Sequence, residues 1–342
     1  MTHEPSAAQN ARERQHANHL RSTPPRLNFA VKRLVRSSSF LIRSIPANRS
    51  LLVTLKKFFV DRSSSLRAYQ LDFDFYCRRP GLRWSASAFP DLLTRHMLFE
   101  GTYDEDALIA LKNLIRPGDI VYDVGGHHGL MTVISAQSTG PKGLVVTFEP
   151  NPRAREQIRL HTDLNNVTNV VLEDVALSDK QEDASFYVQT GDVSWNSTLI
   201  DGYLHDEDNR FVECISVKTQ TLDKYVAQSH RVPQVIKIDA EGSELRILKG
   251  AEGTITNSRP IVIMEMNPSS AESAQTTISD FVQFWEARSY RLTVLGTDVL
   301  GHYTFRAPES FDELKHARMG KGYANVICIP DEMMSSSDSE RG

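Results

Sequence analysis

Cysteine and long apolar runs are scarce in this sequence, and each shortage excludes a class of protein. The 342 residues include three cysteines, Cys77, Cys214 and Cys328, each more than a hundred residues from the next. This spacing fits neither a metal-binding motif nor a disulfide framework, so we expect a reducing compartment. No stretch approaches the roughly 18 uncharged apolar residues of a membrane-spanning helix, and the N-terminus lacks the compact apolar segment of a secretory signal.

Acidic residues are absent from one long stretch, between Arg14 and Val60. Residues 1–70 carry 13 Lys/Arg against three acids, a net charge of +10, and we call them the basic arm. The rest of the chain carries 26 Lys/Arg and 40 Asp/Glu, a net charge of −14. An acidic body is a poor platform for phosphates, so we expect no specific nucleic-acid partner.

The basic arm contains one segment, residues 51–60, with the pattern of a basic amphipathic helix. Such a helix can pack on the body, lie on a membrane surface or form part of an organellar presequence. Glu4 and Glu13 count against a presequence. We therefore expect a cytoplasmic protein, with an organelle as the alternative and peripheral membrane contact through the arm as a hypothesis. The pattern gives no indication of oligomeric state.

The rest of the composition is that of a folded protein. Hydrophobic residues make up 40% and charged residues 24%, which excludes whole-chain disorder. After the basic arm, residues 71–118 combine an aromatic patch with two helical patterns and read as a lead-in that packs on the core. We predict a main domain at residues 119–330 and a frayed, Ser-rich tail at 331–342.

Strand and helix patterns alternate regularly through the main domain. Buried-strand patterns occupy residues 120–124, 144–149, 170–172, 235–239 and 261–265. Helical patterns occupy residues 128–137, 152–164, 243–250 and 278–288. This alternation predicts a parallel sheet covered on both faces. Antiparallel pairs are expected for residues 184–189 with 211–219, and for 292–295 with 324–329.

A glycine-rich turn follows the first strand of the main domain, from Asp123 to Gly129. The dinucleotide-binding pattern G-x-G-x-x-G fails there, because its third position holds His127. The spacing D-x-G-x-x-x-G is instead typical of methyltransferases that bind S-adenosylmethionine. Asp123 can attract the amino group of the methionine moiety, and Gly125 and Gly129 leave room for the cofactor. The alternative is a tight strand-to-helix turn with no ligand.

Acidic residues also end the next two strands. Glu149 lies 26 residues after Asp123, where a carboxylate can accept hydrogen bonds from both ribose hydroxyls. Since NAD sites use an acid similarly, Glu149 indicates an adenosine ligand without specifying which one. Asp174 can accept from the adenine amino group. Its neighbour Glu173 is an alternative candidate for that role. A further alternative is that the acid here is a solvent-exposed loop residue that binds no ligand.

Charged residues interrupt the fourth strand, which should be apolar at the centre of a parallel sheet. Lys237, Asp239 and Glu241 share one face at two-residue spacing. Because an unpaired buried charge is costly, we expect partners, and Glu265 on the next strand is the predicted partner of Lys237. The cluster is either a structural ion pair or a functional site at the rim where ligands bind.

These segments together resemble the FkbM-type methyltransferases, a family that mostly methylates hydroxyl oxygens with S-adenosylmethionine. The resemblance covers about half of the chain, roughly from Phe99 to Pro268. It rests on residues 120–129, 148–152, 175–179, 221–223, 236–244 and 248–251. It implies a Rossmann-like fold of seven strands with the last antiparallel. It also implies a cofactor site at Asp123, Gly125, Gly129 and Glu149.

One position departs from the family, which often has Ala-Asn where this chain has Gly126-His127. We expect His127 to offer a hydrogen bond to the cofactor and Gly126 to make room beside this bulkier, titratable side chain. The full predicted cofactor set is Asp123, Gly125, Gly126, His127, Gly129, Glu149 and Asp174.

The predicted reaction is methyl transfer to a hydroxyl of a small molecule such as a sugar, lipid or secondary metabolite. An aliphatic hydroxyl is a weak nucleophile, so a base is expected. Asp239 is the first choice, Glu241 the second and His128 a distant third. Lys237 and Glu265 are expected to hold Asp239.

Substrate contacts are predicted at Asn196 and Ser197, in the polar loop 194–198, and at Glu265. A metal is not required. The alternatives are a nitrogen or protein acceptor, an inactive adenosine-binding module tethered by the basic arm, and, more weakly, a dehydrogenase.

Overall fold

The computed structural model describes residues 73–78, 80–88, 91–189, 197–201, 212–297, 303–306 and 324–333. It divides into two compact units, Met1–Tyr103 and Asp104–Gly342, which we describe separately. The expectations for residues 1–72, Asn196 and the tail beyond residue 333 therefore lie outside the described residues. Within these ranges no helix is both long enough and apolar enough to cross a bilayer.

A hairpin and one helix form the described part of the first unit. Strands β1 (Asp74–Cys77) and β2 (Leu82–Ser85) pair antiparallel, with Phe75 opposite Trp84. Helix α4 (Leu92–Phe99) begins at Asp91, whose carboxylate accepts from the backbone N–H of Thr94 at 2.9 Å. The indole N–H of Trp84 donates to the Thr94 hydroxyl at 3.4 Å, so α4 packs on the hairpin. The aromatic patch therefore belongs to a hairpin that its pattern did not predict.

The second unit is built on one eight-stranded sheet in the order β13-β12-β14-β11-β10-β3-β4-β5. Its parallel strands are β3 (Ile120–Val124), β4 (Leu144–Phe148), β5 (Val170–Glu173), β10 (Val235–Ile238) and β11 (Ile261–Met266). Three more strands complete it: β12 (Tyr290–Thr297), β13 (Tyr303–Arg306) and β14 (Ala324–Pro330). Strand β14 runs antiparallel to both β11 and β12, as predicted for the closing strands. The eighth strand, β13, was not predicted.

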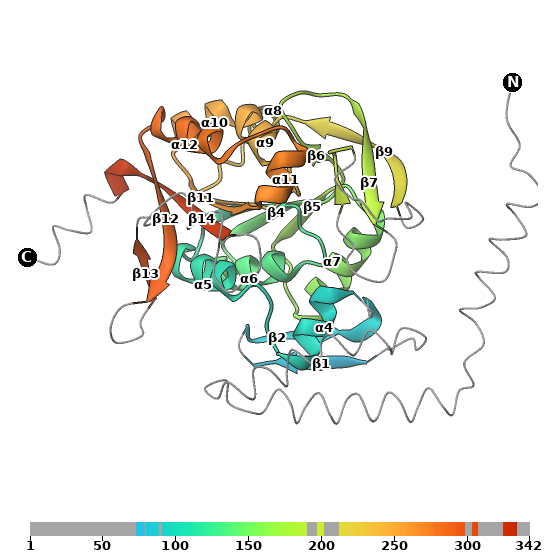
Figure 1. The fold of residues 1–342 in the computed structure, drawn as a ribbon. Coiled ribbons are helices and arrows are strands. Elements are labelled where there is room, and N and C mark those ends of the chain that lie inside the picture. Colours follow the sequence, from blue (N-terminus) through green and yellow to red (C-terminus); the bar gives the residue numbers. More distant parts are fainter. Residues whose placement is uncertain are drawn as a thin grey trace, which may run out of the picture. The chain divides into compact units, whose positions relative to one another are not determined.

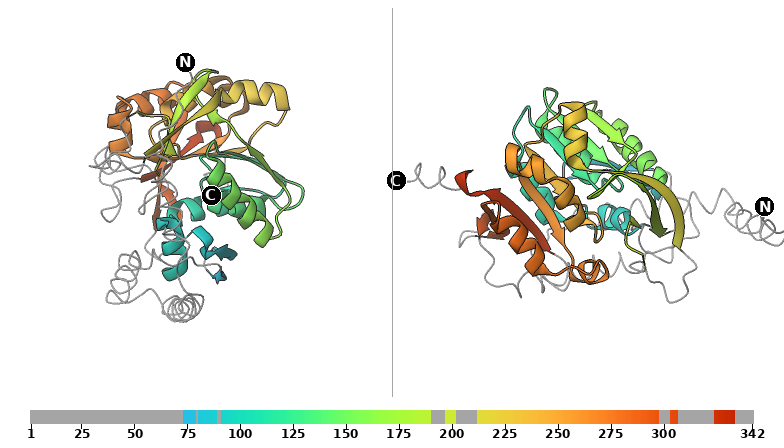
Figure 2. Two further views of the ribbon diagram at one scale, coloured as in Figure 1. Left: turned by 90° about the vertical axis from the view of Figure 1, so that its right-hand side faces the viewer. Right: turned by 90° about the horizontal axis from the view of Figure 1, so that it is seen from above.

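Helices cover both faces of this sheet, as Figures 1 and 2 show. On one face lie α5 (Glu105–Leu114), α6 (Leu130–Thr139) and α7 (Pro152–Leu164). On the other lie α8 (Leu222–Ser229), α9 (Glu244–Gly250), α10 (Glu252–Ser258) and α12 (Ile278–Glu286). The short helix α11 (Pro268–Ser273) follows β11. The predicted Rossmann-like methyltransferase fold with a mostly parallel sheet is confirmed.

The two faces of the sheet differ in chemistry because strand side chains alternate. Tyr122, Ile236 and Val262 point to the face of α8, α9, α10 and α12, where they form part of a large apolar core. The intervening Asp123 and Lys237 point to the face of α5 and α6, and their Cα atoms are directly paired in the register. A buried polar row therefore crosses the sheet below its carboxyl edge.

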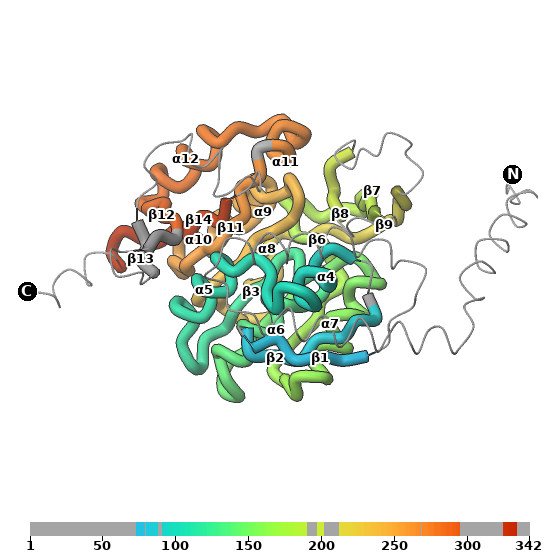
Figure 3. Tube along the Cα trace, turned by 60° about the horizontal axis from the view of Figure 1, so that its bottom comes forward, coloured from blue at the N-terminus to red at the C-terminus, as the bar shows by residue number. Residues whose placement is uncertain are grey.

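A second, four-stranded sheet has the order β6-β9-β7-β8 and stands apart from β12 and β13, as Figure 3 shows. Its strands are β6 (Ala176–Leu177), β7 (Asp183–Gln189), β8 (Ser197–Thr198) and β9 (Val212–Gln220). Strands β7 and β9 pair antiparallel along their length, which confirms the predicted pair. The two-residue β8 was not predicted.

Candidate active site

The glycine turn lies against the loop that follows β10. Gly125 has φ +82°, and a Cβ atom added to it would collide with the backbone carbonyl oxygen of Asp239. Gly129 has φ +86°, and its Cβ would lie 3.1 Å from the Cα of Ile158 in α7. Both conformations favour glycine. The neighbours that the two glycines accommodate are parts of the chain itself, and the expected room for a cofactor stays a prediction.

Gly126 lies close to β4, because a Cβ atom added to it would collide with the Thr147 methyl group. The expectation that it makes room beside His127 stays a prediction. His127 has φ +49°, a left-handed conformation that is unusual for a residue with a side chain. This conformation directs the His127 backbone N–H to the carboxylate of Glu149, at 2.8 Å.

Glu149 ties the glycine turn to the end of β4. Its Oε2 accepts from the His127 N–H, and its Oε1 accepts from the Asn151 N–H at 2.8 Å. The side chain is 5% exposed. Burial raises the pKa of Glu149 to about 7, against the opposing effect of these two hydrogen bonds. Each carboxylate oxygen has a second lone pair, so the group can accept further hydrogen bonds from a ligand.

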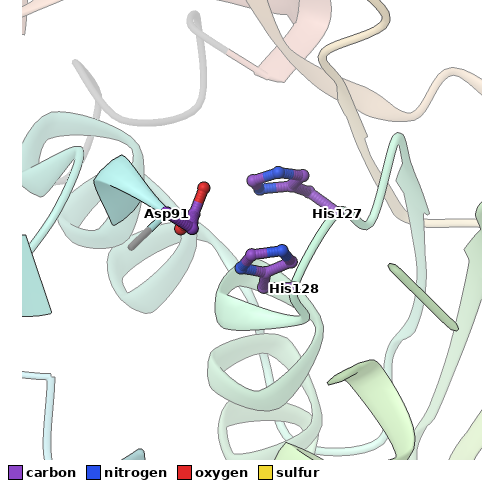
Figure 4. A group of neighbouring side chains, drawn as sticks. All are labelled: Asp91, His127 and His128. Carbon is purple, nitrogen blue, oxygen red and sulfur yellow. The ribbon is translucent and has the colours of Figure 1, made fainter. Parts of the chain in front are cut away.

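The two histidines of the turn stack on each other, as Figure 4 shows. Their ring centroids are 4.1 Å apart and the ring planes differ by 6°. His128 is fully buried just before α6, and its carbonyl oxygen lies 2.7 Å from Nδ1 of His161. The assignment of His127 to the cofactor and the third-choice role of His128 as a base stay predictions.

Asp123 lies below the turn and faces α6. The residue is fully buried, and its Oδ2 accepts from the Thr132 hydroxyl at 2.6 Å. Within the described part of the chain, Oδ1 has no hydrogen-bond partner. Burial raises the pKa of this carboxyl, and the nearby ammonium of Lys237 opposes the shift. The proposed contact with a methionine amino group stays a prediction.

Lys237 pairs with Asp239 and not with the predicted Glu265. Its Nζ lies 2.8 Å from Oδ2 of Asp239, and the Lys237 side chain is 4% exposed. Burial alone would lower the pKa of Lys237, but the carboxylates of Asp239 and Asp123 outweigh it and raise the pKa. Asp239 directly follows the last residue of β10, Ile238, and is only two residues from Lys237. It can therefore reach the ammonium whatever the register between β10 and β11. The expectation that Lys237 holds Asp239 is supported by this contact.

Glu265 belongs to an acidic group on the same face. Its pKa is raised by burial and by the charges of Asp239, Glu241 and Asp104, while Lys237 opposes the shift. The Cα partner of Glu265 on β14 is Asn325, whose Nδ2 donates to Oδ1 of Asp104 at 2.7 Å. Asp104 is the N-cap residue of α5, has φ +45° and makes no side-chain cap hydrogen bond. No sequence signal could connect residues 221 positions apart.

The loop between β10 and α9 carries Asp239 and Glu241 and is held by a residue that our sequence reasoning missed. Glu241 has φ +48° and Gly242 has φ +100°. The carboxylate of Glu244 accepts from the backbone N–H groups of Ala240 and Gly242, each at 2.9 Å. Burial raises the pKa of Glu244 to about 7. The sequence did contain a signal for this role of Glu244, since an acidic residue at the start of a helix can accept from backbone N–H groups of the preceding turn.

Residues 197 and 198, the described part of the loop expected to contact substrate, lie against two loops at the carboxyl edge of the main sheet. Ser197 in β8 accepts from Nδ2 of Asn151 at 3.3 Å, and the hydroxyl of Thr198 donates to the carbonyl of Glu241 at 2.7 Å. Thus β8 contacts the loops after both β4 and β10. Asp174 is exposed at the end of β5. Its role with adenine stays a prediction, as does the substrate role of Ser197.

The predicted residues of β3, β4, β10 and β11 therefore gather at one edge of the sheet, while Asp174 lies exposed after β5. A small pocket opens beside them, lined by Glu244, Glu265, Met266, Asn267, Ser270, Ala271, Ile278 and Phe281. Along the buried row, Lys237 lies among the carboxyl groups of Asp123, Asp239 and Glu265. In their charged forms these groups would attract a cationic ligand and repel an anionic one.

Comparisons with known proteins indicate the family of this chain. Residues 123–292 match the model of the methyltransferase FkbM domain. The chain is 26% identical over 162 residues to the hexuronic acid methyltransferase AglP of Haloferax volcanii. That match covers 47% of this chain and 61% of the relative, so the chain spans about three-fifths of its length.

Two crystal structures of methyltransferases are among those similar to the fold. The methyltransferase FkbM of Methylobacillus flagellatus KT is 13% identical, with a TM-score of 0.38, covering 70% of this chain and 53% of that one. A SAM-dependent O-methyltransferase of Thermotoga maritima is 8% identical, with a TM-score of 0.36, covering 67% and 66%.

Proposed function

This chain belongs to the FkbM methyltransferase family, and we propose that it transfers a methyl group from S-adenosylmethionine to a hydroxyl oxygen of a small molecule. The observation that carries the proposal is the buried carboxylate of Glu149, tied to the glycine turn beside β3. It stands at the carboxyl end of the neighbouring strand, where an acid can accept from both hydroxyls of a ribose. The acceptor classes we propose are a sugar, a lipid or a secondary metabolite.

The cofactor would supply an electrophilic methyl carbon on a cationic sulfonium. The chain would hold the adenosine at Glu149, with the glycine turn and Asp174 as further contacts. The surplus of carboxylates around Lys237 supports binding of a cation at this edge. The chain would also have to keep water out and place the acceptor oxygen in line with the methyl group.

We assign the proton-accepting role to Asp239. Its side chain is 29% exposed, so it is accessible to a substrate hydroxyl, while the pairing with Lys237 fixes one of its oxygens. The other oxygen can then receive the proton that the acceptor loses. Glu241, two residues further along the loop, is the second choice. Glu265 and Ser197 are the proposed substrate contacts on either side.

The test measures binding and transfer separately. Calorimetry with S-adenosylhomocysteine should give weaker binding to Glu149→Ala than to wild type, by about tenfold or more for a lost charged hydrogen-bond acceptor. Asp239→Ala should bind this probe as wild type does and lose turnover. Equal affinity of wild type and Glu149→Ala would contradict the cofactor site.

The acceptor class is found with methyl-labelled S-adenosylmethionine. A panel of neutral sugars, hexuronic acids, lipid headgroups, amines and a peptide mixture is incubated with the protein, and products are identified by mass spectrometry. Labelled ethers support the proposal, whereas labelled esters would place the methyl group on a carboxylate oxygen and contradict a hydroxyl acceptor. Labelled amines or peptides would favour the nitrogen or protein alternative, and binding without any transfer would favour an inactive module.

A further inference from the structure

The hydroxyl of Thr198 makes two hydrogen bonds, one of which joins β8 to the loop after β10. The residue is fully buried, and its hydroxyl donates to the backbone carbonyl of Glu241 at 2.7 Å. The same oxygen accepts from the backbone N–H of Ile200 at 3.0 Å, which orients the hydroxyl. Ile200 adds a packing contact, because a Cβ atom on Gly242 would lie 3.1 Å from its Cγ1. The loop after β10 therefore rests on residues 198–200.

This loop is held in a conformation that it would not adopt unaided. The left-handed backbone of Glu241 costs about 1 kcal/mol or more relative to an ordinary conformation. Glu244 stabilises the loop from the helix side by accepting from two of its N–H groups. Thr198 stabilises it from the opposite side through the Glu241 carbonyl. Removing the Thr198 hydroxyl would take this donor away from the partly buried Glu241 carbonyl.

The same segment reaches the proposed cofactor residues. Asn151 donates its backbone N–H to Glu149 and its side-chain amide to Ser197, the neighbour of Thr198. On the other side of the loop, the carbonyl of Asp239 lies directly against Gly125 of the glycine turn. The loop with Asp239 and Glu241 is thus fixed between the glycine turn and β8.

We infer that Thr198 is a positioning residue for methyl transfer. Its hydroxyl holds the Glu241 carbonyl and thereby sets where Asp239 and Glu241 stand relative to the glycine turn. It touches neither cofactor nor acceptor in this role. The inference rests on the proposed function for its catalytic consequence, but the loop-holding role can be measured without any methyl transfer.

Three variants of the full chain test the inference. Thr198→Val keeps the branched shape and removes the hydroxyl, whereas Thr198→Ser keeps the hydroxyl. The matched control is Thr219→Val, because the Thr219 hydroxyl is also buried, donates to the Lys180 carbonyl at 2.9 Å and accepts from the Glu182 N–H at 3.0 Å. If Thr198→Val does not yield folded protein, Thr198→Ala replaces it.

The first readout is hydrogen exchange at the amides of residues 240–244. We expect exchange about tenfold faster in Thr198→Val, and rates within about twofold of wild type in Thr198→Ser and Thr219→Val. Unchanged exchange in Thr198→Val would overturn the inference. So would equally fast exchange in Thr198→Ser, since rescue by the hydroxyl is what a positioning contact requires.

The second readout separates turnover from affinity. With labelled S-adenosylmethionine and the panel acceptor that gives the most product, kcat should fall about tenfold or more in Thr198→Val, while the Kd of S-adenosylhomocysteine stays within about threefold. Equal losses of affinity and turnover would overturn the catalytic part. If no acceptor is methylated by wild type, the proposed function fails, and the exchange rates still decide whether Thr198 holds the loop.

Discussion

Lys237 is a buried cation among carboxylates, and its removal should affect the whole fold. Replacing it by methionine keeps the length and removes the charge, which leaves Asp123 and Asp239 without their shared counter-ion. Breaking a buried ion pair from one side costs about 3–5 kcal/mol. We therefore expect Lys237→Met to lower the free energy of unfolding by about that amount, measured by urea denaturation.

The control for this prediction is Lys180→Met. Lys180 pairs with Glu182 at 2.9 Å, but the two side chains are 61% and 42% exposed. Exposed pairs contribute about 0–1 kcal/mol, so this variant should unfold close to the wild-type urea concentration. A Lys237→Met protein as stable as Lys180→Met would show that burial does not make the Lys237 pair important.

Glu149 should make cofactor binding depend on pH. Its pKa is raised to about 7 by burial, so the carboxyl gains a proton as the pH falls from 8 to 6. The protonated form has lost its charge and part of its accepting capacity. We expect the Kd of S-adenosylhomocysteine to rise by up to about tenfold per pH unit below 7, measured by calorimetry.

The ligand-free protein should become more stable as the pH falls, although its affinity for the cofactor decreases. A carboxyl with a raised pKa binds more protons folded than unfolded between its ordinary value and about 7, so acidification through this window stabilises the fold. Glu244 should act with the same sign. The matched variant, Glu149→Gln, cannot titrate and should bind the probe with no pH dependence in this window. Equal pH dependence in both proteins would contradict the prediction.

The contact of Lys237 shows what the residue pattern could predict and what it could not. Spacing placed Lys237, Asp239 and Glu241 on one face, with Glu265 on the next strand, and the structure puts Lys237 and Glu265 on the same face of the sheet. We predicted Glu265 as the partner of Lys237, but the pattern does not exclude Asp239, because a flexible lysine side chain can reach either carboxylate. Packing decided it, since Asp104 and Asn325 come together near Glu265 from distant parts of the chain.

Among the elements, the glycine turn gives the sharpest prediction. Gly125→Ala would force a Cβ into the carbonyl of Asp239, whereas Gly118→Ala meets nothing within 4 Å. Both glycines have positive φ, +82° and +96°, so both variants carry the backbone penalty of about 1–2 kcal/mol.

We expect Gly125→Ala to be destabilised by about 2 kcal/mol or more beyond Gly118→Ala, because backbone must move to relieve the collision. It should also weaken S-adenosylhomocysteine binding, while Gly118→Ala binds as wild type does. Thermal unfolding and calorimetry measure the two effects. Similar losses in both variants would show that the turn tolerates a side chain against the loop of Asp239.

Elements with local signals were predictable, and those without were not. Helix α7 begins at Pro152 after an Asn151 cap, and the predicted range 152–164 is the observed one. Strand β8 has two residues and no pattern of its own, and it exists because β7 and the loop after β10 bind it. The sequence predicted a substrate contact at Ser197, but only the tertiary structure revealed the contact of Thr198 with the loop after β10.

At the scale of the whole molecule, the basic arm carries a charge opposite to that of the rest of the chain, and its role can be tested separately. The matched domain starts at residue 123, so residues 1–60 lie outside it. We propose that the arm serves localisation or contact with a membrane surface. Deleting residues 1–60 should leave the affinity for S-adenosylhomocysteine and the turnover within about twofold of wild type, since no predicted site residue is removed.

The same deletion should abolish binding to anionic vesicles. Co-sedimentation with phosphatidylserine-containing vesicles should retain the full chain at low salt and release it near about 0.5 M salt, where charges are screened. Vesicles of phosphatidylcholine alone are the control. Loss of turnover in a folded truncated protein would instead mean that the arm helps to build the site.

The sequence by itself determined the class of fold, the order of the central elements and the acids at the ends of their strands. These features follow from local periodicity and turn chemistry, which neighbouring residues specify. Only the tertiary structure decided that Lys237 pairs with Asp239, that Gly125 lies against the Asp239 carbonyl and that Thr198 holds Glu241. Such contacts depend on how close two separate segments come, which no local pattern specifies.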